Sequence, residues 1–81
     1  MYDIIIESNA ENFLKKLDKK EAELILKKIY SIRKNPFRFL KKLQGHKLWR
    51  LRITNYRAII SVVVSNKKII ILRIGFRKNI Y

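Results

Sequence analysis

The spacing of hydrophobic residues changes once along this chain, and that change restricts the folds it can adopt. Over residues 10–17 and 22–32 the apolar side chains recur every three or four positions, which predicts two amphipathic helices. From Trp49 onward the spacing is two, because Trp49, Leu51 and Ile53 alternate with arginines, as in a strand with one buried and one solvated face. The chain is therefore expected to combine a helical hairpin with a sheet.

Local signals predict where the first elements begin and end. Residues 2–7 are a β-branched run that predicts a strand, and Ser8 precedes Glu11 at the spacing of a capping box, so a helix is expected to begin there. Asp18 offers the N-cap of a second helix. Pro36 is expected to end that helix, because the residue before a proline avoids the helical conformation.

The C-terminal part predicts a three-stranded antiparallel meander. Gly45 is the expected turn in an irregular basic stretch, and the polar residues 65–67 suit a hairpin turn. The expected strands cover residues 49–53, 56–64 and 68–75. The order strand, helix, helix, strand, strand, strand predicts one α+β domain over residues 1–81, with the helices packed on one face of a small, mostly antiparallel sheet.

Charge is divided along the chain as well. All six Asp and Glu residues lie within the first 23 positions, whereas sixteen of the twenty Lys and Arg follow them, and the net charge is +14. A long basic stretch predicts an anionic partner, most simply nucleic-acid phosphate. The hydrophobic runs are too short to span a bilayer and the N-terminus carries acids where a signal peptide carries bases, so a soluble, cytoplasmic protein without membrane contacts is expected.

The same distribution limits the chemistry. A metal-dependent nuclease needs several converging carboxylates or histidines, but the chain has one histidine, no cysteine and no acid after Glu23, so no metal or other cofactor is expected. RNA cleavage remains open, because RNA supplies its own nucleophile, the 2′-hydroxyl. The protein then has to supply in-line geometry, cations around the phosphate and groups that move protons.

Strand parity groups the arginines. Arg50 and Arg52 share one face of their strand, Arg57 begins the next strand, and Arg73 shares a face of the last strand with Arg77 if that strand stays regular. If these faces coincide, the sheet presents a concave, arginine-lined surface opposite the helices, which suits a phosphate backbone. The alternative is a solvated sheet face on which arginine stems cover apolar neighbours.

Several segments resemble the RelE/ParE toxin superfamily in order and spacing. They are residues 43–45 (Leu-Gln-Gly), 48–53 (Leu-Trp-Arg-Leu-Arg-Ile), 55–60 (Asn-Tyr-Arg-Ala-Ile-Ile) and 74–81. The resemblance implies a RelE-type toxin, a small ribonuclease that enters the ribosomal A site, cuts messenger RNA there and is neutralised by a cognate antitoxin. An acidic, partly disordered antitoxin segment in a hetero-oligomer would also complement the charge of this chain.

The resemblance also implies roles for individual residues. Arg50, Arg52 and Arg57 are expected to bind and orient the phosphates, with arginine standing at two positions where the best-known member has lysine. Arg57 and Arg77 are expected to stabilise the transition state, and Tyr81 to stack on a base and assist proton transfer. The expected catalytic set is Arg52, Arg57, Arg77 and Tyr81. The expected RNA-binding set is Arg50, Arg52, Lys47, Arg73 and Lys78.

Other side chains are weighed against structural roles. Trp49 and Tyr56 are expected to pack between the helices and the sheet. Phe76 stands where many relatives carry histidine, and its ring would be able to stack on RNA. His46 has a pKa suited to proton transfer, but a lone histidine in a loop is more often an ordinary surface residue.

Two other functions stay open beside the ribonuclease. One is a ParE-type toxin that keeps the fold, lacks the basic catalytic set and acts on DNA gyrase through protein contacts. The other is an RNA- or ribosome-binding module without catalytic activity. The retained basic set, which includes Arg50, Arg57 and Arg77, favours the ribonuclease.

Overall fold

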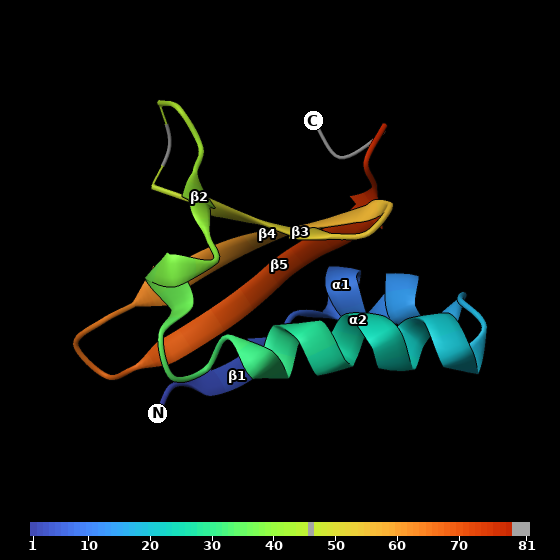
Figure 1. The fold of residues 1–81 in the computed structure, drawn as a ribbon, viewed down its shortest axis with the longest axis horizontal. Coiled ribbons are helices and arrows are strands. Elements are labelled where there is room, and N and C mark those ends of the chain that lie inside the picture. Colours follow the sequence, from blue (N-terminus) through green and yellow to red (C-terminus); the bar gives the residue numbers. More distant parts are fainter. Residues whose placement is uncertain (46, 79–81) are drawn as a thin grey trace.

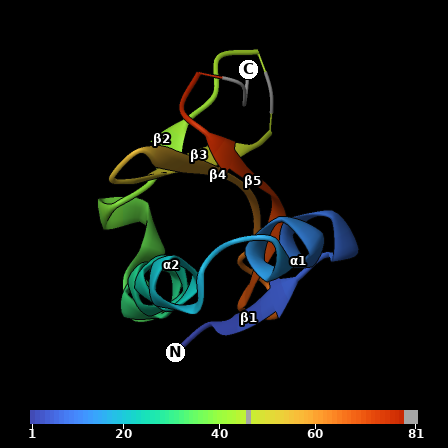
Figure 2. The same cartoon turned by 90° about the vertical axis from the view of Figure 1, so that its right-hand side faces the viewer.

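The computed structural model describes residues 1–45 and 47–78, which form two helices on one side of a five-stranded sheet (Figures 1 and 2). The strand order is β1-β5-β4-β3-β2; β1 runs parallel to β5 and the other neighbours are antiparallel. The predicted α+β fold and the meander are confirmed. The elements are β1 (Asp3–Ile6), α1 (Ser8–Lys15), α2 (Lys19–Ser31), the 3-10 turn η1 (Pro36–Arg38), β2 (Lys41–Lys42), β3 (Trp49–Ile53), β4 (Tyr56–Val63) and β5 (Lys68–Phe76).

The start of α1 differs from the prediction. Glu7 is the N-cap residue and no side chain caps the helix, so the capping box predicted at Ser8 and Glu11 is wrong. The sheet explains the difference, because the extended Glu7 donates its N–H to the carbonyl of Ile71 at 3.0 Å and the chain leaves β1 directly into the helix. For α2 the predicted N-cap, Asp18, is confirmed, again without a side-chain hydrogen bond.

The connection between α2 and β3 contains more structure than its sequence indicates. Pro36 is buried and begins η1, and Leu40 closes the turn by donating its N–H to the carbonyl of Pro36 at 3.1 Å. The two-residue strand β2 then pairs with β3. It was not predicted, since two exposed lysines carry no alternation. Gly45 has φ +76°, so the expected turn is confirmed.

One hydrophobic cluster joins both helices to the sheet. The helices contribute residues at the predicted spacing, β3 and β4 contribute every second residue, and β5 contributes Ile69, Ile71 and Ile74. The side chains with 2% exposure or less are Ala10, Ile25, Ile29, Ile32, Leu51, Ile53, Ala58, Ile60, Ile69 and Ile71. Trp49 packs against this cluster and Tyr56 belongs to it, as expected. The sheet therefore has an inner face toward the helices and an outer face away from them.

A bulge in β5 decides which residues lie on the outer face. Ile59 of β4 is opposite Arg73, but Ile60 is opposite Ile71, so Leu72 is an extra residue. Ile71 and Ile74 are both buried in the core although they are three positions apart. Without the bulge, Arg73 would share the inner face with Ile71; with it, Arg73 turns outward and is exposed.

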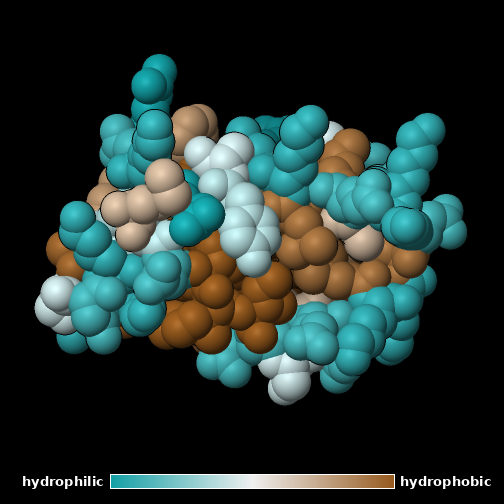
Figure 3. Space-filling view, turned by 90° about the horizontal axis from the view of Figure 1, so that it is seen from below, coloured by the Kyte–Doolittle hydropathy of each residue, from teal (hydrophilic) through white to brown (hydrophobic). Residues whose placement is uncertain are grey.

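The remaining surface combines both kinds of side chain. Seen from below, from the side of β1 and α2, a band of hydrophobic residues lies between hydrophilic ones (Figure 3). Ile5 of β1 and Leu24 of α2 are among the exposed large hydrophobic residues, at 42% and 43%. Of the helices in the described ranges, none has the length and apolar character needed to cross a membrane.

Candidate functional site

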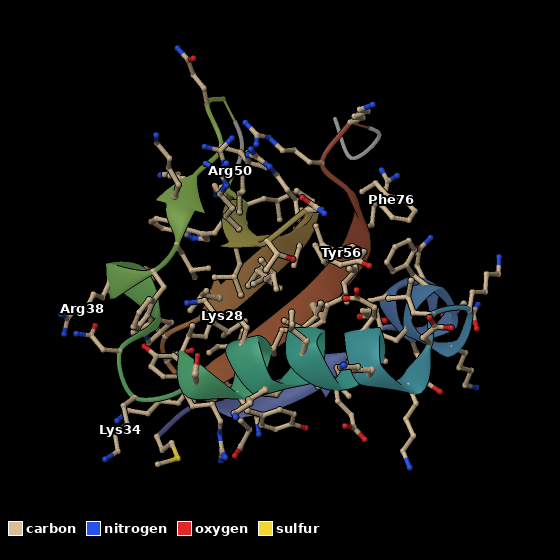
Figure 4. The ribbon with its side chains drawn as sticks, turned by 45° about the vertical axis from the view of Figure 1, so that its right-hand side comes forward. Lys28, Lys34, Arg38, Arg50, Tyr56 and Phe76 are labelled. Carbon is tan, nitrogen blue, oxygen red and sulfur yellow. The ribbon has the colours of Figure 1, made fainter. Side chains whose placement is uncertain are left out.

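The register of the sheet aligns basic side chains in rows on the outer face. In one row, Lys41, Arg50, Ile59 and Arg73 lie side by side on β2, β3, β4 and β5. Arg50 points away from the helices (Figure 4). Ile59 is only 7% exposed yet lies outside the hydrophobic core cluster, so side chains of the outer face cover it. The row is therefore a positively charged surface that the apolar Ile59 side chain supports from beneath.

The next row brings two arginines directly opposite each other. Arg52 of β3 pairs with Arg57 of β4, and Arg57 pairs with Gly75 of β5. Gly75 contributes no side chain to this row. Like charges in directly opposed positions repel, and an anion bound between them would remove that repulsion. Arg57 is also buried, at 7% exposure, so its guanidinium is held more firmly than those of the exposed arginines.

Two segments rise from the sheet on either side of these rows. Figure 1 shows the chain between β2 and β3 at one end and the chain after β5 at the other, both on the side away from the helices. Lys47 is exposed in the first segment, and Arg77 and Lys78 are exposed in the second. The Arg77 N–H donates to the carbonyl of Asn55 at 2.9 Å, which fixes this segment to the turn between β3 and β4.

Two hollows flank the arginine rows. Asn55, Phe76, Arg77 and Lys78 line one of about 650 Å³. The other, of about 480 Å³, is a groove between α2 and the end of β3, with Leu24 and Ile53 as apolar lining and lysines and an arginine around them. The residues lining the groove are Leu24, Lys27, Lys28, Ser31, Arg52, Ile53 and Thr54. Arg52 thus belongs to the outer-face row and to this groove.

The inner face near Arg57 is aromatic rather than basic. Tyr56 and Phe76 lie side by side (Figure 4), with ring centroids 5.4 Å apart. Phe13 meets both rings edge-on. Burial raises the pKa of the Tyr56 hydroxyl, and the negative charges of Glu21 and Asp18 and a hydrogen bond to Glu21 raise it further. At neutral pH this hydroxyl is therefore a neutral packing and hydrogen-bonding group. Phe76 remains 47% exposed at the rim.

The predicted residues can now be located. Arg50, Arg52, Arg57 and Arg73 share the outer face, while Lys47, Arg77 and Lys78 lie on the two segments beside it. Tyr81 and His46 lie outside the described residues. Within the described ranges, His, Asp and Glu side chains form no group of three that could hold a metal ion. The sequence did not predict that Ile59 supports the outer-face row, nor the groove next to Arg52, because both depend on pairing between distant segments.

Comparison with known proteins identifies the family. The family described as the ParE toxin of the type II toxin-antitoxin system parDE has a model that matches residues 4–81. The chain belongs to the ParE toxin family. It is thus a toxin of the RelE/ParE superfamily, as the sequence motifs indicate. A search of curated proteins found no match.

Solved structures of RelE toxins share the fold of this ParE-family chain. It is similar to a chain of the RelBE2 toxin–antitoxin complex from Mycobacterium tuberculosis, with TM-score 0.86, 20% identity and coverage of 94% of this chain and 98% of that one. For the RelE–RelB complex from Pyrococcus horikoshii OT3 the values are 0.81, 28%, 96% and 97%. For the RelB–RelE complex from Methanococcus jannaschii they are 0.72, 26%, 95% and 94%.

Proposed function

We propose that this toxin is a metal-independent endoribonuclease that cuts messenger RNA in the ribosomal A site and so inhibits translation. The observation that carries the proposal is the outer face, where the sheet register places Arg50 and Arg73 in one row, with Arg52 and Arg57 paired in the next row. No Asp or Glu occurs in the sequences of β2, β3, β4 or β5. Such a surface attracts a chain of phosphates and disfavours an acidic catalytic centre.

The chemistry would use groups of the RNA itself. The 2′-oxygen attacks the adjacent phosphorus, the bond to the 5′-oxygen breaks, and the products are a 2′,3′-cyclic phosphate and a 5′-hydroxyl. Arg50 and Arg52 bind and orient the phosphates, and Arg57 with Arg77 stabilises the charge that builds on the phosphoryl oxygens. Lys47, Arg73 and Lys78 hold the flanking backbone.

Burial favours Arg57 as the central group of this set. A guanidinium held at 7% exposure needs little reorganisation during the reaction, and the lower local dielectric strengthens its interaction with a phosphoryl oxygen. Arginine also presents a planar fork of donors that matches a phosphate. Its high pKa makes it a poor proton carrier, so proton transfer falls to other groups, with Tyr81 as the candidate for stacking on a base and assisting that transfer.

An antitoxin is the second proposed partner. The RelE matches from Mycobacterium tuberculosis, Pyrococcus horikoshii and Methanococcus jannaschii are toxin–antitoxin complexes. The groove beside Arg52 has apolar lining from Leu24 and Ile53 and three cations around it, so an acidic, amphipathic segment suits it in both respects. A segment seated there would contact Arg52 and compete with RNA for it.

The test is a cleavage reaction on ribosomes programmed with messenger RNA and holding an empty A site, with EDTA present. Wild-type protein should cut within the A-site codon and leave a 2′,3′-cyclic phosphate, whereas Arg57→Ala should leave the message intact. Ribosome sedimentation of both proteins measures binding separately. Intact message under tight wild-type binding would overturn the nuclease and leave a ribosome-binding protein.

Action on DNA gyrase is the second candidate, because the matching family model is named for ParE toxins. A supercoiling reaction with purified gyrase separates the two. Inhibition that survives Arg57→Ala, together with uncut messenger RNA, would favour protein contacts with gyrase over RNA cleavage.

A further inference from the structure

Aromatic and basic side chains alternate on a surface that the proposed cleavage does not use. It lies where η1 and β2 meet α2 and the start of β3, and we name it the aromatic–cation surface. Its members are Phe37, Phe39, Trp49, Lys28, Arg38 and Lys42. Figure 4 shows Lys28 and Arg38 at this end of the molecule, with the Arg38 guanidinium pointing outward.

The contacts within this surface are specific. Lys28 Nζ lies 5.0 Å from the centroid of the Phe39 ring, and Arg38 Cζ lies 5.9 Å from the same ring. Phe37 meets Trp49 edge-on at 4.9 Å, and Lys42 Nζ lies 5.9 Å from the Trp49 ring. Each cation is within the range of a cation–π interaction, so aromatic rings and positive charge are held close to one another.

The exposed rings are held by a fixed backbone. Buried Pro36 and Leu40 anchor the two ends of the turn, and the N–H groups of Phe39 and Leu40 both donate to the Pro36 carbonyl, at 3.0 and 3.1 Å. Phe37 and Phe39 nevertheless remain 39% and 42% exposed. Two phenyl rings kept in water by anchored neighbours indicate a binding surface rather than a packing defect.

Charge at this surface is not neutralised within the described chain. The ion pairs of Lys15 with Glu11 and of Lys68 with Asp3 involve none of its cations. The surface borders the proposed cleavage face across the edge strand β2, where Lys41 pairs with Arg50 on the outer face and Lys42 pairs with Trp49 on the inner face. An RNA strand that leaves the arginine rows at Arg50 would meet Lys41 first and, after passing around the β2 edge, Lys42 and the exposed phenyl rings.

We propose that the aromatic–cation surface binds single-stranded RNA, with bases stacked on Phe39 and Phe37 and phosphates held by Lys42 and Arg38. Stacking platforms beside cations are what single-stranded nucleic acids require, and every base offers a face to stack. The proposal rests on the proposed function in that RNA is the ligand. It adds a site that positions RNA, separate from the arginine rows that act on the phosphate.

Binding of a fluorescent single-stranded RNA of about 12 nucleotides, followed by anisotropy over a range of salt, tests the proposal. Phe39→Leu should weaken binding about tenfold with little change in salt dependence, since it removes a stacking face and no charge. Lys42→Gln should lower the slope of log affinity against log salt by about 0.7, the value for one phosphate contact in a single strand.

Matched controls come from elsewhere in the chain. Tyr30 is 47% exposed and carries Arg33 over its ring at 5.7 Å, so Tyr30→Leu removes an equally exposed aromatic with its cation, and binding should stay within about twofold. Lys16→Gln removes one lysine charge from the end of α1 and should leave the salt slope unchanged. Thermal melting establishes that all four variants fold.

Polyglutamate serves as the probe for charge alone. Phe39→Leu should leave its binding unchanged; equal weakening for RNA and polyglutamate would overturn RNA as the ligand and favour an acidic protein. Equal effects of Phe39→Leu and Tyr30→Leu on RNA would overturn the site itself.

The ribosome reaction separates this proposal from the nuclease. Phe39→Leu should raise the ribosome concentration at half-maximal cleavage and leave the maximal rate intact. If the wild type cuts and Phe39→Leu matches it in both binding and cleavage, the aromatic–cation surface is refuted and the nuclease stands. If the wild type does not cut but Phe39→Leu still weakens RNA binding, the nuclease is refuted and the surface stands.

Discussion

The two ends of the outer sheet face carry cations in different surroundings. At the β1 end, Lys68 Nζ lies 2.8 Å from Asp3 Oδ2. At the other end, Arg52 faces Arg57, and the strands there contribute no carboxylate side chain. The pairing explains the contrast, because β1 comes from the acidic N-terminal part and pairs only with residues 68–71 of β5. A cation beside a carboxylate stabilises the fold, whereas several cations aligned on one face suit an external anion.

The largest expected effect tests whether the arginine end alone is functional. Arg57→Ala should lower the single-turnover rate of messenger-RNA cleavage by about 10²–10³-fold, as for the loss of one donor to a developing oxyanion. Lys68→Ala removes a cation from the other end of the same face and should cleave at the wild-type rate. Rates of both variants on programmed ribosomes decide the matter, with circular dichroism as the check of folding. Equal loss in both would mean that only overall charge matters.

Much of the contrast between the two ends of the outer face was predictable from the sequence, but the bulge in β5 was not. Parity put Arg50 and Arg52 on one face of a strand, and the structure confirms that Arg57 and Arg73 share it. The run at residues 69–72 is apolar at every position, so alternation could not reveal the bulge at Leu72. That one extra residue turns Arg73 outward.

Other features depend on contacts between distant segments. The parallel pairing of β1 with β5 joins residues more than sixty positions apart, and nothing in the sequence of residues 2–7 specifies its partner. The groove beside Arg52 likewise requires α2 and β3 together. Helix faces and turns were predictable because they depend on near neighbours in the chain; pairings and hollows were not, because they depend on the packed whole.

The two faces of β4 should differ in their contribution to stability. Ile60 is fully buried against the helices, and Ile60→Ala should lower the free energy of unfolding by about 3–5 kcal/mol. Ile59 is covered by the side chains of the outer face, which can relax, so Ile59→Ala should cost about 2 kcal/mol or less. Denaturant titration measures both changes.

The rate of messenger-RNA cleavage gives a second comparison of the Ile59→Ala and Ile60→Ala variants. Ile59→Ala should also slow cleavage, because the apolar side chain that supports Arg50 and Arg73 is lost. Folded Ile60→Ala should cleave at the wild-type rate. The reverse order of stabilities would mean that Ile59, not Ile60, belongs to the main core.

Tyr56 and Arg57 are adjacent in sequence but lie on opposite faces, and pH should separate them. The pKa of Tyr56 is raised by burial and by Glu21 and Asp18, so its neutral form favours the folded state. Its contribution is complete below the unfolded value near pH 10 and is lost as pH rises through the raised folded value. Tyr56→Phe should therefore lack this alkaline loss of stability.

Thermal melting of wild type and Tyr56→Phe from neutral to strongly alkaline pH measures the difference, with ultraviolet absorbance to follow phenolate formation. Cleavage by Tyr56→Phe should keep the wild-type pH profile, since this hydroxyl lies on the inner face. A shifted profile would make Tyr56 part of the proton-transfer chemistry and would break the division between the faces.

The smallest effect belongs to the ion pair at the β1 end. A hydrogen bond from Lys68 and its positive charge hold the pKa of Asp3 below its usual value of 3.8. The stabilisation is present above the unfolded pKa and is lost as pH falls through the lower folded pKa. Asp3→Asn should therefore melt slightly below the wild type at neutral pH, and the two should converge in strong acid. Because Asp3 is exposed, solvent keeps the difference small. A difference that persists in strong acid would assign the effect to something other than the carboxylate, and a change in cleavage rate would show that the two ends of the outer face are not independent.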